Sequence, residues 1–393
     1  MTVTLIADDL TGACDASALF AGRGRVGVFV DADAVSPGWE VAALDTDSRA
    51  LAPDAARRRM RDVVRRIEAR LHAGHVFKKI DSTLRGPVAE EIDSLLDEVG
   101  GGTALICPAF PGQGRTVTDG VLRVDGLPVH ASSIGRDPAY RGATSAVGVL
   151  LGGSRRTVRH LPLDRVRQGS SAVAAVLAGA ADEIVAADAE TDTDLDMLAA
   201  AAAPMSHVIL AGSAGLAGPV ATHLGHAAAA PPLPRGRAWL VVAGSLHPST
   251  RAQVGALAAA GLAGAALDRT GGADTRWLAD ELRAGRPVFL TTTESVAPGE
   301  DTRPRVAAAL AAAAASLVSE CAPDLVVLTG GETAHAFMRA RGARRLEVRG
   351  APAVGLALGE LVTDGAPALA CLTKAGGFGA RDLLVRLLGG VPS

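Results

Sequence analysis

The sequence predicts an α/β protein of two domains, each with a mostly parallel sheet flanked by helices. First, short apolar runs of strand length alternate with helical stretches along the whole chain, a pattern typical of parallel sheets crossed by helices. Second, the chain has 393 residues, 48% of them hydrophobic and 21% charged, so it can bury more than one core. Third, a proline-rich segment, AAAAPPLPRG at 227–236, is the clearest interruption of the alternation.

The first domain is expected over residues 1–228. Apolar runs bounded by turn residues predict its strands, and apolar residues at helical spacing predict its helices. Strands are expected at 2–7, 26–30, 76–80, 104–107, 183–187 and 208–211, and helices at 12–21, 53–71 and 88–96. Between residues 112 and 140, a non-helical segment rich in Gly, Asp and Arg includes TVTDGVLRVDGLPV. This indicates a hairpin-like excursion, and loops of this length are usually functional or mobile.

A linker at 229–236 is expected to separate this domain from a second one at 237–393. Three of the four residues 231–234 are proline, and proline cannot continue a helix or a central strand. The alternation then restarts. Strands are expected at 239–242, 288–291 and 325–328, and helices at 250–260 and 304–319.

The composition excludes several classes of function. A formal net charge of -3 and an aromatic content of 3% give no sign of a nucleic-acid partner or of a polybasic membrane-binding surface. No apolar stretch has the length and flanks of a membrane span, and the N-terminus MTVTLIADDL lacks the basic region of a signal peptide. Four scattered cysteines without CxxC or zinc-finger spacing are expected to be buried thiols in a reducing, cytoplasmic setting. The oligomeric state stays open, with a homodimer as one candidate.

Lysine is almost absent from the chain. Lysine and arginine together number 39, yet lysine occurs only at positions 78, 79 and 374. A compact ammonium and a planar guanidinium do different chemistry, so lysines kept in such a chain mark positions to examine for function. Codon bias with three accidental survivors is the alternative explanation.

Two aspartates follow the first predicted strand, in the motif ADDLTGA at 7–13. In open α/β sheets, ligands bind outside the carboxyl ends of the strands. Asp8 and Asp9 are therefore candidates to bind a polyol or a metal, or to act as a base. The alternative is that Asp9 only caps the next helix.

A second motif, KKIDSTLRG at 78–86, follows another strand and is expected to open a helix. Its lysines, Arg85 and the hydroxyls of Ser82 and the next residue would form an anion site at a helix N-terminus. Strand alternation places Lys79 and Asp81 on one face and Lys78 on the other. A surface salt bridge together with a helix cap is the alternative.

Two further segments are expected at the same sheet edge. PAFPGQGRTVTDG at 108–120 could lay Arg115 and Asp119 over it, and Arg49 lies shortly after another strand. The four motifs together offer two or three cations and several carboxylates at the edge where ligands bind. This combination suits a small, anionic, hydroxylated substrate.

The second domain has three glycine-rich turns after strands: AGS at 243–245, TGGET at 329–333 and TKAGGFG at 373–379. Exposed backbone N–H groups in such turns bind phosphates, and Lys374 would add a mobile cation beside them. Each turn alone is often only a helix cap or a tight turn, but three on one domain favour nucleotide phosphates. A G-x-G-x-x-G match at 22–27 lies between a helix and a strand, the wrong context for a dinucleotide site, and no P-loop or G-x-S-x-G motif occurs.

Six motifs in order resemble the four-carbon acid sugar kinase family: ADDLTGA, KKIDSTLRG, PAFPGQGRTVTDG, AGSAGLA at 211–217, TGGETA at 329–334 and KAGGFG at 374–379. The resemblance covers essentially the whole chain. It implies a sugar-acid-binding domain followed by a nucleotide-binding domain, in an enzyme that uses ATP to phosphorylate the terminal hydroxyl of threonate, erythronate or 3-oxo-tetronate. Ala375 departs from the serine that often follows the lysine of the last motif, and residues 159–203 match no motif.

The resemblance also implies residues that contact ATP. These are Ser245, Gly330, Gly331, Glu332, Thr333, Gly376 and Gly377. For the acid substrate, Arg85 and Arg115 would bind the carboxylate, and Lys79 or Lys374 would stabilise charge on the transferring phosphoryl group. The remaining residues expected at the substrate site are Asp8, Arg49, Ser82 and Asp119.

The chemistry of phosphoryl transfer sets the remaining expectations. Asp9 is the first candidate for the base that takes the hydroxyl proton, and Asp81 is the second. ATP is expected to bring Mg²⁺, because the reaction depends on positioning and electrostatics, and the sequence reveals no protein ligand for a metal. One alternative is a two-domain sensor that binds a sugar acid and a nucleotide without chemistry. Another is a nicotinamide-dependent oxidoreductase, which would need a glycine fingerprint where ADDLTGA stands.

Overall fold

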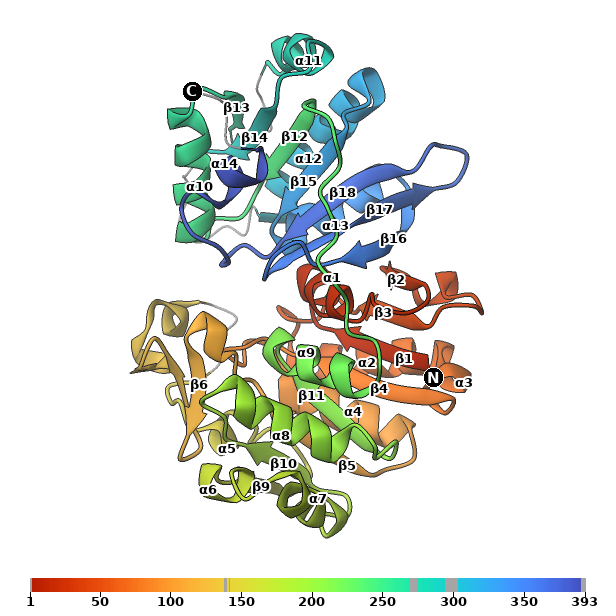
Figure 1. Ribbon diagram of the computed structural model, residues 1–393, viewed down its shortest axis with the longest axis vertical. Helices are drawn as coiled ribbons and strands as arrows, with labels where there is room; N and C mark the ends of the chain where they lie inside the picture. Colours follow the sequence, from red (N-terminus) through yellow and green to blue (C-terminus); the bar gives the residue numbers. More distant parts are fainter. Residues whose placement is uncertain (1, 138–139, 141, 269–273, 294–302, 390–393) are drawn as a thin grey trace. The chain divides into compact units, whose positions relative to one another are not determined.

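The computed structural model describes residues 2–137, 140, 142–268, 274–293 and 303–389 (Figure 1). The chain divides into two compact units, Met1–Ala228 and Ala229–Ser393. In each unit helices pack against a sheet whose strands are mostly parallel. The predicted α/β class is therefore confirmed.

The sheet of the first unit is parallel throughout its described pairs, in the order β2-β3-β1-β4-β11-β5-β10-β9. Its strands are β1 (Thr2–Ala7), β2 (Val26–Phe29), β3 (Val41–Asp45), β4 (Gly74–Lys79), β5 (Thr103–Cys107), β9 (Val158–Leu161), β10 (Ile184–Ala187) and β11 (Val208–Gly212). Ala7 pairs with Asp45 of β3 and with Lys79 of β4. Three neighbouring strands thus end level with one another, and the polar residues that follow them meet at one edge.

Helices cover both faces of this sheet. They are α1 (Leu10–Leu19), α2 (Pro53–Arg66), α3 (Glu68–Leu71), α4 (Val88–Glu98), α5 (Val147–Leu150), α6 (Leu163–Val166), α7 (Ser170–Ala178), α8 (Asp192–Ala202) and α9 (Ala214–His223). Phe77 packs against Phe20 at the end of α1, with ring centroids 6.3 Å apart, whereas the neighbouring Lys78 pairs with Glu91 of α4. Because successive side chains of a strand point to opposite faces, α1 and α4 lie on opposite faces of the sheet.

The segment after β5 forms a small sheet of its own. Strands β6 (Arg115–Thr118), β7 (Val121–Val124) and β8 (Leu127–Pro128) pair antiparallel in that order, which confirms the predicted hairpin-like excursion. Short 3₁₀ turns complete the unit: η1 (Ala32–Ala34), η2 (Pro111–Gln113), η3 (Val129–Ala131) and η4 (Ser133–Arg136). The helix predicted at 53–71 is divided at Ile67 into α2 and α3.

The sheet of the second unit has the order β13-β14-β12-β15-β18-β17-β16. Its strands are β12 (Trp239–Ala243), β13 (Ala263–Leu267), β14 (Val288–Thr292), β15 (Leu325–Thr329), β16 (Ala343–Gly350), β17 (Leu356–Thr363) and β18 (Leu369–Lys374). The first five strands in this order are parallel, and β17 pairs antiparallel with both β18 and β16. The carboxyl ends of β12, β15 and β18 are therefore adjacent, and each of the three predicted glycine-rich turns follows one of them.

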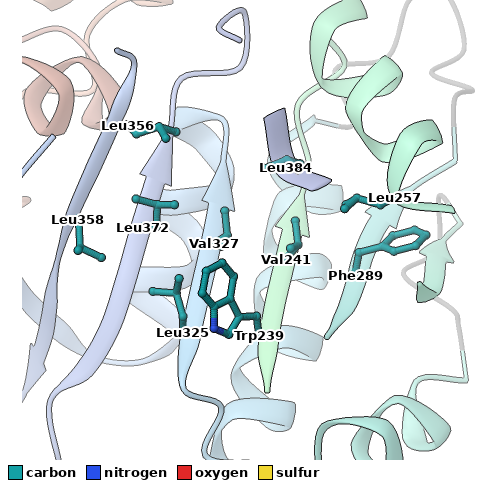
Figure 2. Close-up of a cluster of buried hydrophobic side chains, with 10 residues drawn as sticks. All are labelled: Trp239, Val241, Leu257, Phe289, Leu325, Val327, Leu356, Leu358, Leu372 and Leu384. Carbon is teal, nitrogen blue, oxygen red and sulfur yellow. The ribbon is translucent and has the colours of Figure 1, made fainter. Parts of the chain in front are cut away.

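The helices of the second unit are α10 (Pro248–Ala259), α11 (Arg276–Arg283), α12 (Arg303–Cys321), α13 (Gly331–Ala340) and α14 (Leu383–Leu387). Figure 2 shows the core on one face of the sheet, where alternate residues of each strand point the same way. Trp239 and Val241 of β12 lie beside Leu325 and Val327 of β15, and Leu257 of α10 lies on the other side of Val241, near Phe289 of β14. This apolar layer holds the strands that present the glycine-rich turns.

Length and composition alone would let one segment of α12, Pro304–Cys321, cross a membrane. Leu310, Ala311, Ala314 and Leu317 of this helix are buried, and the helix packs on α13, β12 and β14. A core helix of a folded domain passes the same length and composition test, so the segment is weak evidence for a membrane span.

Candidate functional site

Carboxylates and arginines gather at the carboxyl ends of β3, β1 and β4. Asp8 and Asp9 follow β1, Arg49 follows β3, and Asp81 follows β4. Arg49 donates from Nε to Asp8 Oδ2 at 2.7 Å and from Nη2 to Asp8 Oδ1 at 2.9 Å, and Nη2 also donates to Asp9 Oδ1 at 2.6 Å. The same nitrogen lies 4.0 Å from Asp81 Oδ1. With Arg85 these four residues form what we call the Asp–Arg cluster.

Asp9 is both a helix cap and a member of this cluster. As the N-cap of α1 it accepts from the Gly12 N–H at 3.1 Å, and its other oxygen accepts from Thr11 Oγ1 at 2.6 Å. Burial raises the pKa of Asp9, but Arg49, Lys79 and the Thr11 hydroxyl lower it, and the net pKa lies below its usual value. Asp9 is therefore ionised at neutral pH.

Asp81 is more fully occupied than Asp9. Arg85 donates to the Asp81 carboxylate from Nε at 2.9 Å and from Nη2 at 2.7 Å. The backbone N–H and the hydroxyl of Thr83 also donate to this carboxylate. Burial raises the pKa of Asp81, but Arg85 and Arg49 outweigh this effect and hold it well below its usual value. The Asp81 side chain is 8% exposed, against 17% for Asp9.

The expectation that KKIDSTLRG opens directly into a helix is wrong, and the anion site that it predicts stays a prediction. The helix α4 begins only at Val88, after Pro87, and Leu84 has a positive φ of 57°, which places residues 82–86 in a turn. The Thr83 hydroxyl bonds Asp81, and Ser82 is half-buried in the same turn. Arg85 is likewise paired, with Asp81 and with Asp137 at 2.9 Å.

The two adjacent lysines of β4 point in opposite directions, as strand alternation predicts. Lys79 Nζ donates to the Ile80 carbonyl at 2.9 Å and lies close enough to lower the pKa of Asp9. Lys78 is completely buried and pairs with Glu91 at 2.7 Å on the other face. Only Lys79 therefore adds positive charge to the Asp–Arg cluster.

Arg115 differs from the other two arginines of this edge. Among the residues that the structure describes, no carboxylate lies within 4.0 Å of its guanidinium; Nη1 donates to the Gln113 carbonyl, and Nε is buried without a partner. Burial lowers the pKa of Arg115, while Asp125 and Asp81 act in the opposite direction. Arg115 is thus a partly buried cation within electrostatic reach of Asp81, and its Nε–H is free to donate to a bound anion.

Asp119 lies at the other end of β6 from Arg115, in the tight turn before β7, with φ of 52°. The adjacent Gly120 N–H donates to Asp188, which follows β10. The sheet order places β11 and β5 between β4 and β10, about 14 Å at the usual strand spacing. The structure does not bring Asp119 into the Asp–Arg cluster.

The glycine-rich turns of the second unit touch one another. A Cβ at Gly244 would lie 2.0 Å from Thr333 Oγ1, one at Gly330 would lie 3.1 Å from Ser245 Cβ, and one at Gly376 would lie 2.3 Å from Ser245 Oγ. These turns follow β12, β15 and β18. We call the four glycines 244, 330, 376 and 377, together with Ser245 and Thr333, the glycine cradle.

The cradle presents backbone donors at the start of α13. Gly330 is the N-cap of this ten-residue helix, has φ of 96°, and supplies no side-chain cap. Gly331 begins the helix, Thr333 is buried beneath its first turn, and Glu332 is exposed there. First-turn N–H groups without a side-chain cap, together with the helix dipole, favour an anion such as phosphate.

The expectation that Lys374 is a mobile cation is wrong. The side chain is buried, and Nζ donates to the carbonyls of Ala375 at 2.9 Å and Gly376 at 3.4 Å. Burial lowers the pKa of Lys374 to about 8. The lysine therefore braces the glycine turn from inside, because the last residue of β18 points into the unit rather than out of it.

Two residues near the glycine cradle, His247 and Arg251, are not among those that the sequence predicts for the site. His247 caps α10 by accepting from the Ser249 N–H, and a Cβ at Gly377 would lie 3.3 Å from its Nε2. Arg251, one turn further on, donates to the Thr292 carbonyl at 2.6 Å at the end of β14. His247 is the N-cap of α10 and Arg251 lies within this helix, shortly after the AGS turn. Their position directly after a predicted phosphate-binding turn could have marked them as candidates in the sequence.

Within the part of the chain that the structure describes, no group of three or more His, Cys, Asp or Glu side chains is arranged to hold a metal ion. The Asp8 and Asp81 carboxylates are already bound in two-point contacts by Arg49 and Arg85. These donor sets fit arginine pairing rather than a resident cation.

Two family models match the chain and follow its two units. The model described as sugar-binding N-terminal domain matches residues 3–220, and the model described as nucleotide-binding C-terminal domain matches residues 240–384. The Asp–Arg cluster falls within the first match and the glycine cradle within the second.

Curated relatives match over most of the chain. A D-threonate kinase from Cupriavidus necator is 36% identical over 98% of this chain and 96% of its own length. A D-erythronate kinase from Heliobacterium modesticaldum is 36% identical over 65% of this chain and 60% of its own length. A 3-oxo-tetronate kinase from Methylobacterium radiotolerans is 32% identical over 98% of this chain and 97% of its own length.

Solved structures agree on the fold. A protein from Salmonella typhimurium LT2 superposes with a TM-score of 0.80 at 21% identity, covering 98% of both chains. A domain of unknown function from Bordetella bronchiseptica, a domain-swapped dimer with bound citrate, is 32% identical over 99% of this chain and 98% of its own, with a TM-score of 0.51.

Proposed function

This chain belongs to the four-carbon acid sugar kinase family, and we propose that it uses ATP to phosphorylate the terminal hydroxyl of a four-carbon sugar acid. The observation that carries the proposal is chemical. Among the described residues, one unit has a partly buried arginine, Arg115, without a carboxylate partner but within electrostatic reach of Asp81, and it also has the ionised Asp9. The other unit has a helix N-terminus without a side-chain cap, within the glycine cradle. An acid, a hydroxyl and a phosphate each have a complementary group.

On the first unit, Arg115 binds the substrate carboxylate. Arg49 and Arg85 each already bind carboxylates of the protein itself, so an incoming acid would have to displace them. Arg115 has no such competitor among the described residues, and a charge-assisted bond to a carboxylate would satisfy its buried Nε. The Bordetella relative, 32% identical to this chain, has bound citrate, a polycarboxylate, and this supports the proposal of an acid-binding site.

Asp9 rather than Asp81 takes the proton of the attacking hydroxyl. All the oxygens of Asp81 are engaged by Arg85 and Thr83, whereas the Asp9 Oδ2 atom accepts only the Thr11 hydroxyl. Asp9 is also the more exposed of the two. Its lowered pKa keeps it ionised, and orienting the nucleophile is the main contribution that phosphoryl transfer asks of such a residue.

On the second unit, the glycine cradle binds the phosphates of ATP. Backbone N–H groups can approach a phosphate closely only where no Cβ intervenes, and Cβ atoms at Gly244 and Gly376 would collide with Thr333 and Ser245. Lys374 supports the turn through two carbonyls, and Lys79 is the better placed lysine to stabilise charge near the acceptor. Mg²⁺ arrives with the nucleotide and neutralises phosphate charge when bound.

A solved relative supports a proposal for the oligomeric state, and the free cysteines support a proposal for the cellular location. We propose a homodimer, for which the dimeric Bordetella relative gives support. All four cysteines are free, and three of them are buried, in keeping with the proposed cytoplasmic location. Because relatives named as threonate, erythronate and 3-oxo-tetronate kinases all match, the proposal covers this class of acids rather than one member.

A coupled ADP-release assay over D-threonate, L-threonate, D-erythronate, L-erythronate and 3-oxo-tetronate, with and without Mg²⁺, tests the proposal. We expect Mg²⁺-dependent turnover of at least one acid and none of the matching neutral polyols. ATP binding in calorimetry without turnover of any acid would instead favour a non-catalytic sensor. That alternative is not favoured at present, since the curated relatives are named as kinases.

A further inference from the structure

A buried polar chain lies beneath the Asp–Arg cluster, on the face of the sheet that α4 covers. Lys78 Nζ of β4 lies 2.7 Å from Glu91 Oε2 of α4, and the two side chains are 0% and 1% exposed. The other Glu91 oxygen accepts from the Ser48 hydroxyl. Ser48 Oγ also lies 2.6 Å from Thr46 Oγ1, where either hydroxyl can be the donor, and Thr46 Oγ1 lies 2.8 Å from the Ala7 carbonyl oxygen.

This chain of contacts ends at the segment that carries Arg49. The backbone N–H groups of Ser48 and Arg49 both donate to the Asp8 carbonyl, at 3.0 and 3.2 Å, and the Thr46 N–H donates to the Ala7 carbonyl at 2.9 Å. The segment 46–49 is therefore bonded to the end of β1 on one side and to Glu91 on the other. The Arg49 guanidinium then holds Asp8 and Asp9.

A buried ion pair is a costly way to stabilise a fold. The cost of removing two charges from water is comparable to the gain from their attraction, and apolar side chains of the same size often give an equally stable or more stable fold. A fully connected polar network instead defines one geometry, because each broken bond leaves a buried polar group unpaired. Both Glu91 oxygens are bonded here, so the network is of the connected kind.

We propose that Lys78, Glu91 and Ser48 are positioning residues that fix the 46–49 segment, so that Arg49 orients the Asp9 carboxylate toward the substrate hydroxyl; this rests on the proposed kinase function. Lys78 is thus retained for a contact that is remote from the substrate. A compact ammonium fits between β4 and α4, where a planar guanidinium would need room for a wider fork.

Three variants test this inference. Ser48→Ala removes the bond between Glu91 and the segment. The double variant Lys78→Met/Glu91→Leu removes the buried charges and keeps the apolar volume. Ser94→Ala is the matched control, because Ser94 is also a buried serine, one turn along α4 from Glu91, and its hydroxyl bonds only the Glu90 carbonyl.

Steady-state kinetics and thermal unfolding are measured on each variant. We expect kcat to fall by about 10- to 100-fold in Ser48→Ala and in the double variant, since displacements of about 1 Å have effects of this size. The KM for ATP should stay unchanged, and the double variant should melt no lower than the wild type. A double variant with wild-type kcat overturns the inference. Should that variant fail to fold, Ser48→Ala decides by the same criterion.

A spectroscopic measurement separates this inference from the proposed function. In ¹⁵N-arginine-labelled protein, the Nε–H resonance of Arg49 is identified by its loss in Arg49→Lys. We expect it to shift or broaden in Ser48→Ala and in the double variant but not in Ser94→Ala. This readout needs no substrate, so it still decides the inference if the wild type phosphorylates none of the acids. An unchanged Arg49 resonance in Ser48→Ala overturns it.

Discussion

Replacing Arg115 by glutamine should selectively weaken binding of the acid substrate. Among the described residues, Arg115 has no carboxylate within 4.0 Å, and its Nε is buried without a partner. The free protein therefore bears the cost of burying this cation, as its burial-lowered pKa reflects. Removing the guanidinium relieves that cost and breaks no ion pair with any residue that the structure describes. The variant should consequently unfold at the same temperature as the wild type or slightly higher.

The magnitude follows from the bond that is lost. A hydrogen bond to a charged group contributes about 1.5–3 kcal/mol, and each 1.4 kcal/mol corresponds to about tenfold in affinity. The KM for the acid should thus rise by about 10- to 150-fold, while the KM for ATP stays unchanged because the cradle lies in the other unit.

Coupled ADP-release kinetics with varied acid and saturating ATP provide the assay. Arg123→Gln is the control. Arg123 lies on β7 opposite Thr116, so in the same hairpin it points to the face opposite to that of Arg115. Equal rises in KM for both variants, or no rise for Arg115→Gln, would refute the assignment of Arg115 to the substrate carboxylate.

Three further changes test the chemistry. Asp9→Asn should lower kcat by about 10²- to 10⁴-fold, the usual contribution of a positioned base, in the ADP-release assay; near-normal turnover removes Asp9 from that role. Gly244→Ala places a Cβ 2.0 Å from Thr333 Oγ1, so calorimetry should show weaker ATP binding with the Kd of the acid unchanged; an unaltered ATP Kd contradicts the cradle. Lys374 is buried, with a pKa of about 8 against an ordinary 10.5, so the unfolded chain binds its proton more tightly. The unfolding free energy of the wild type, measured relative to Lys374→Met in denaturant, should therefore rise by about 3 kcal/mol as pH rises from about 8 to about 10.5; a difference that is flat with pH contradicts this.

The sequence predicts the fold well because each element carries its own periodic signal. The strand 2–7 and the strand 325–328 differ from the observed β1 and β15 by at most one residue, since buried parallel strands are short apolar runs with sharp ends. The antiparallel pair β16 and β17 was not among the predicted strands. In β16, charged residues such as Arg345 and Glu347 alternate with buried apolar residues. The strand therefore has no continuous apolar run that would reveal it in the sequence.

The sequence predicts the members of the sites better than their contacts. Motif positions indicate that Asp9, Arg49 and Asp81 lie at one sheet edge, because strand ends share that edge. They do not reveal that Arg85 turns back onto Asp81, which depends on the turn that Leu84 makes with its positive φ. The pairing of Lys78 with Glu91 is equally hidden, since it depends on how α4 packs on β4, two elements joined by an irregular turn.

The burial of every lysine has a practical consequence. Lys78, Lys79 and Lys374 are 0%, 6% and 0% exposed, so the native surface offers no lysine ε-amine to a reagent. Amine-directed esters and crosslinkers should leave these side chains unmodified while the chain is folded, and acetylating enzymes should find no lysine target on it. Labelling of any of the three lysines then reports local opening or unfolding, and mass spectrometry of labelled peptides would distinguish opening near the Asp–Arg cluster from opening near the glycine cradle.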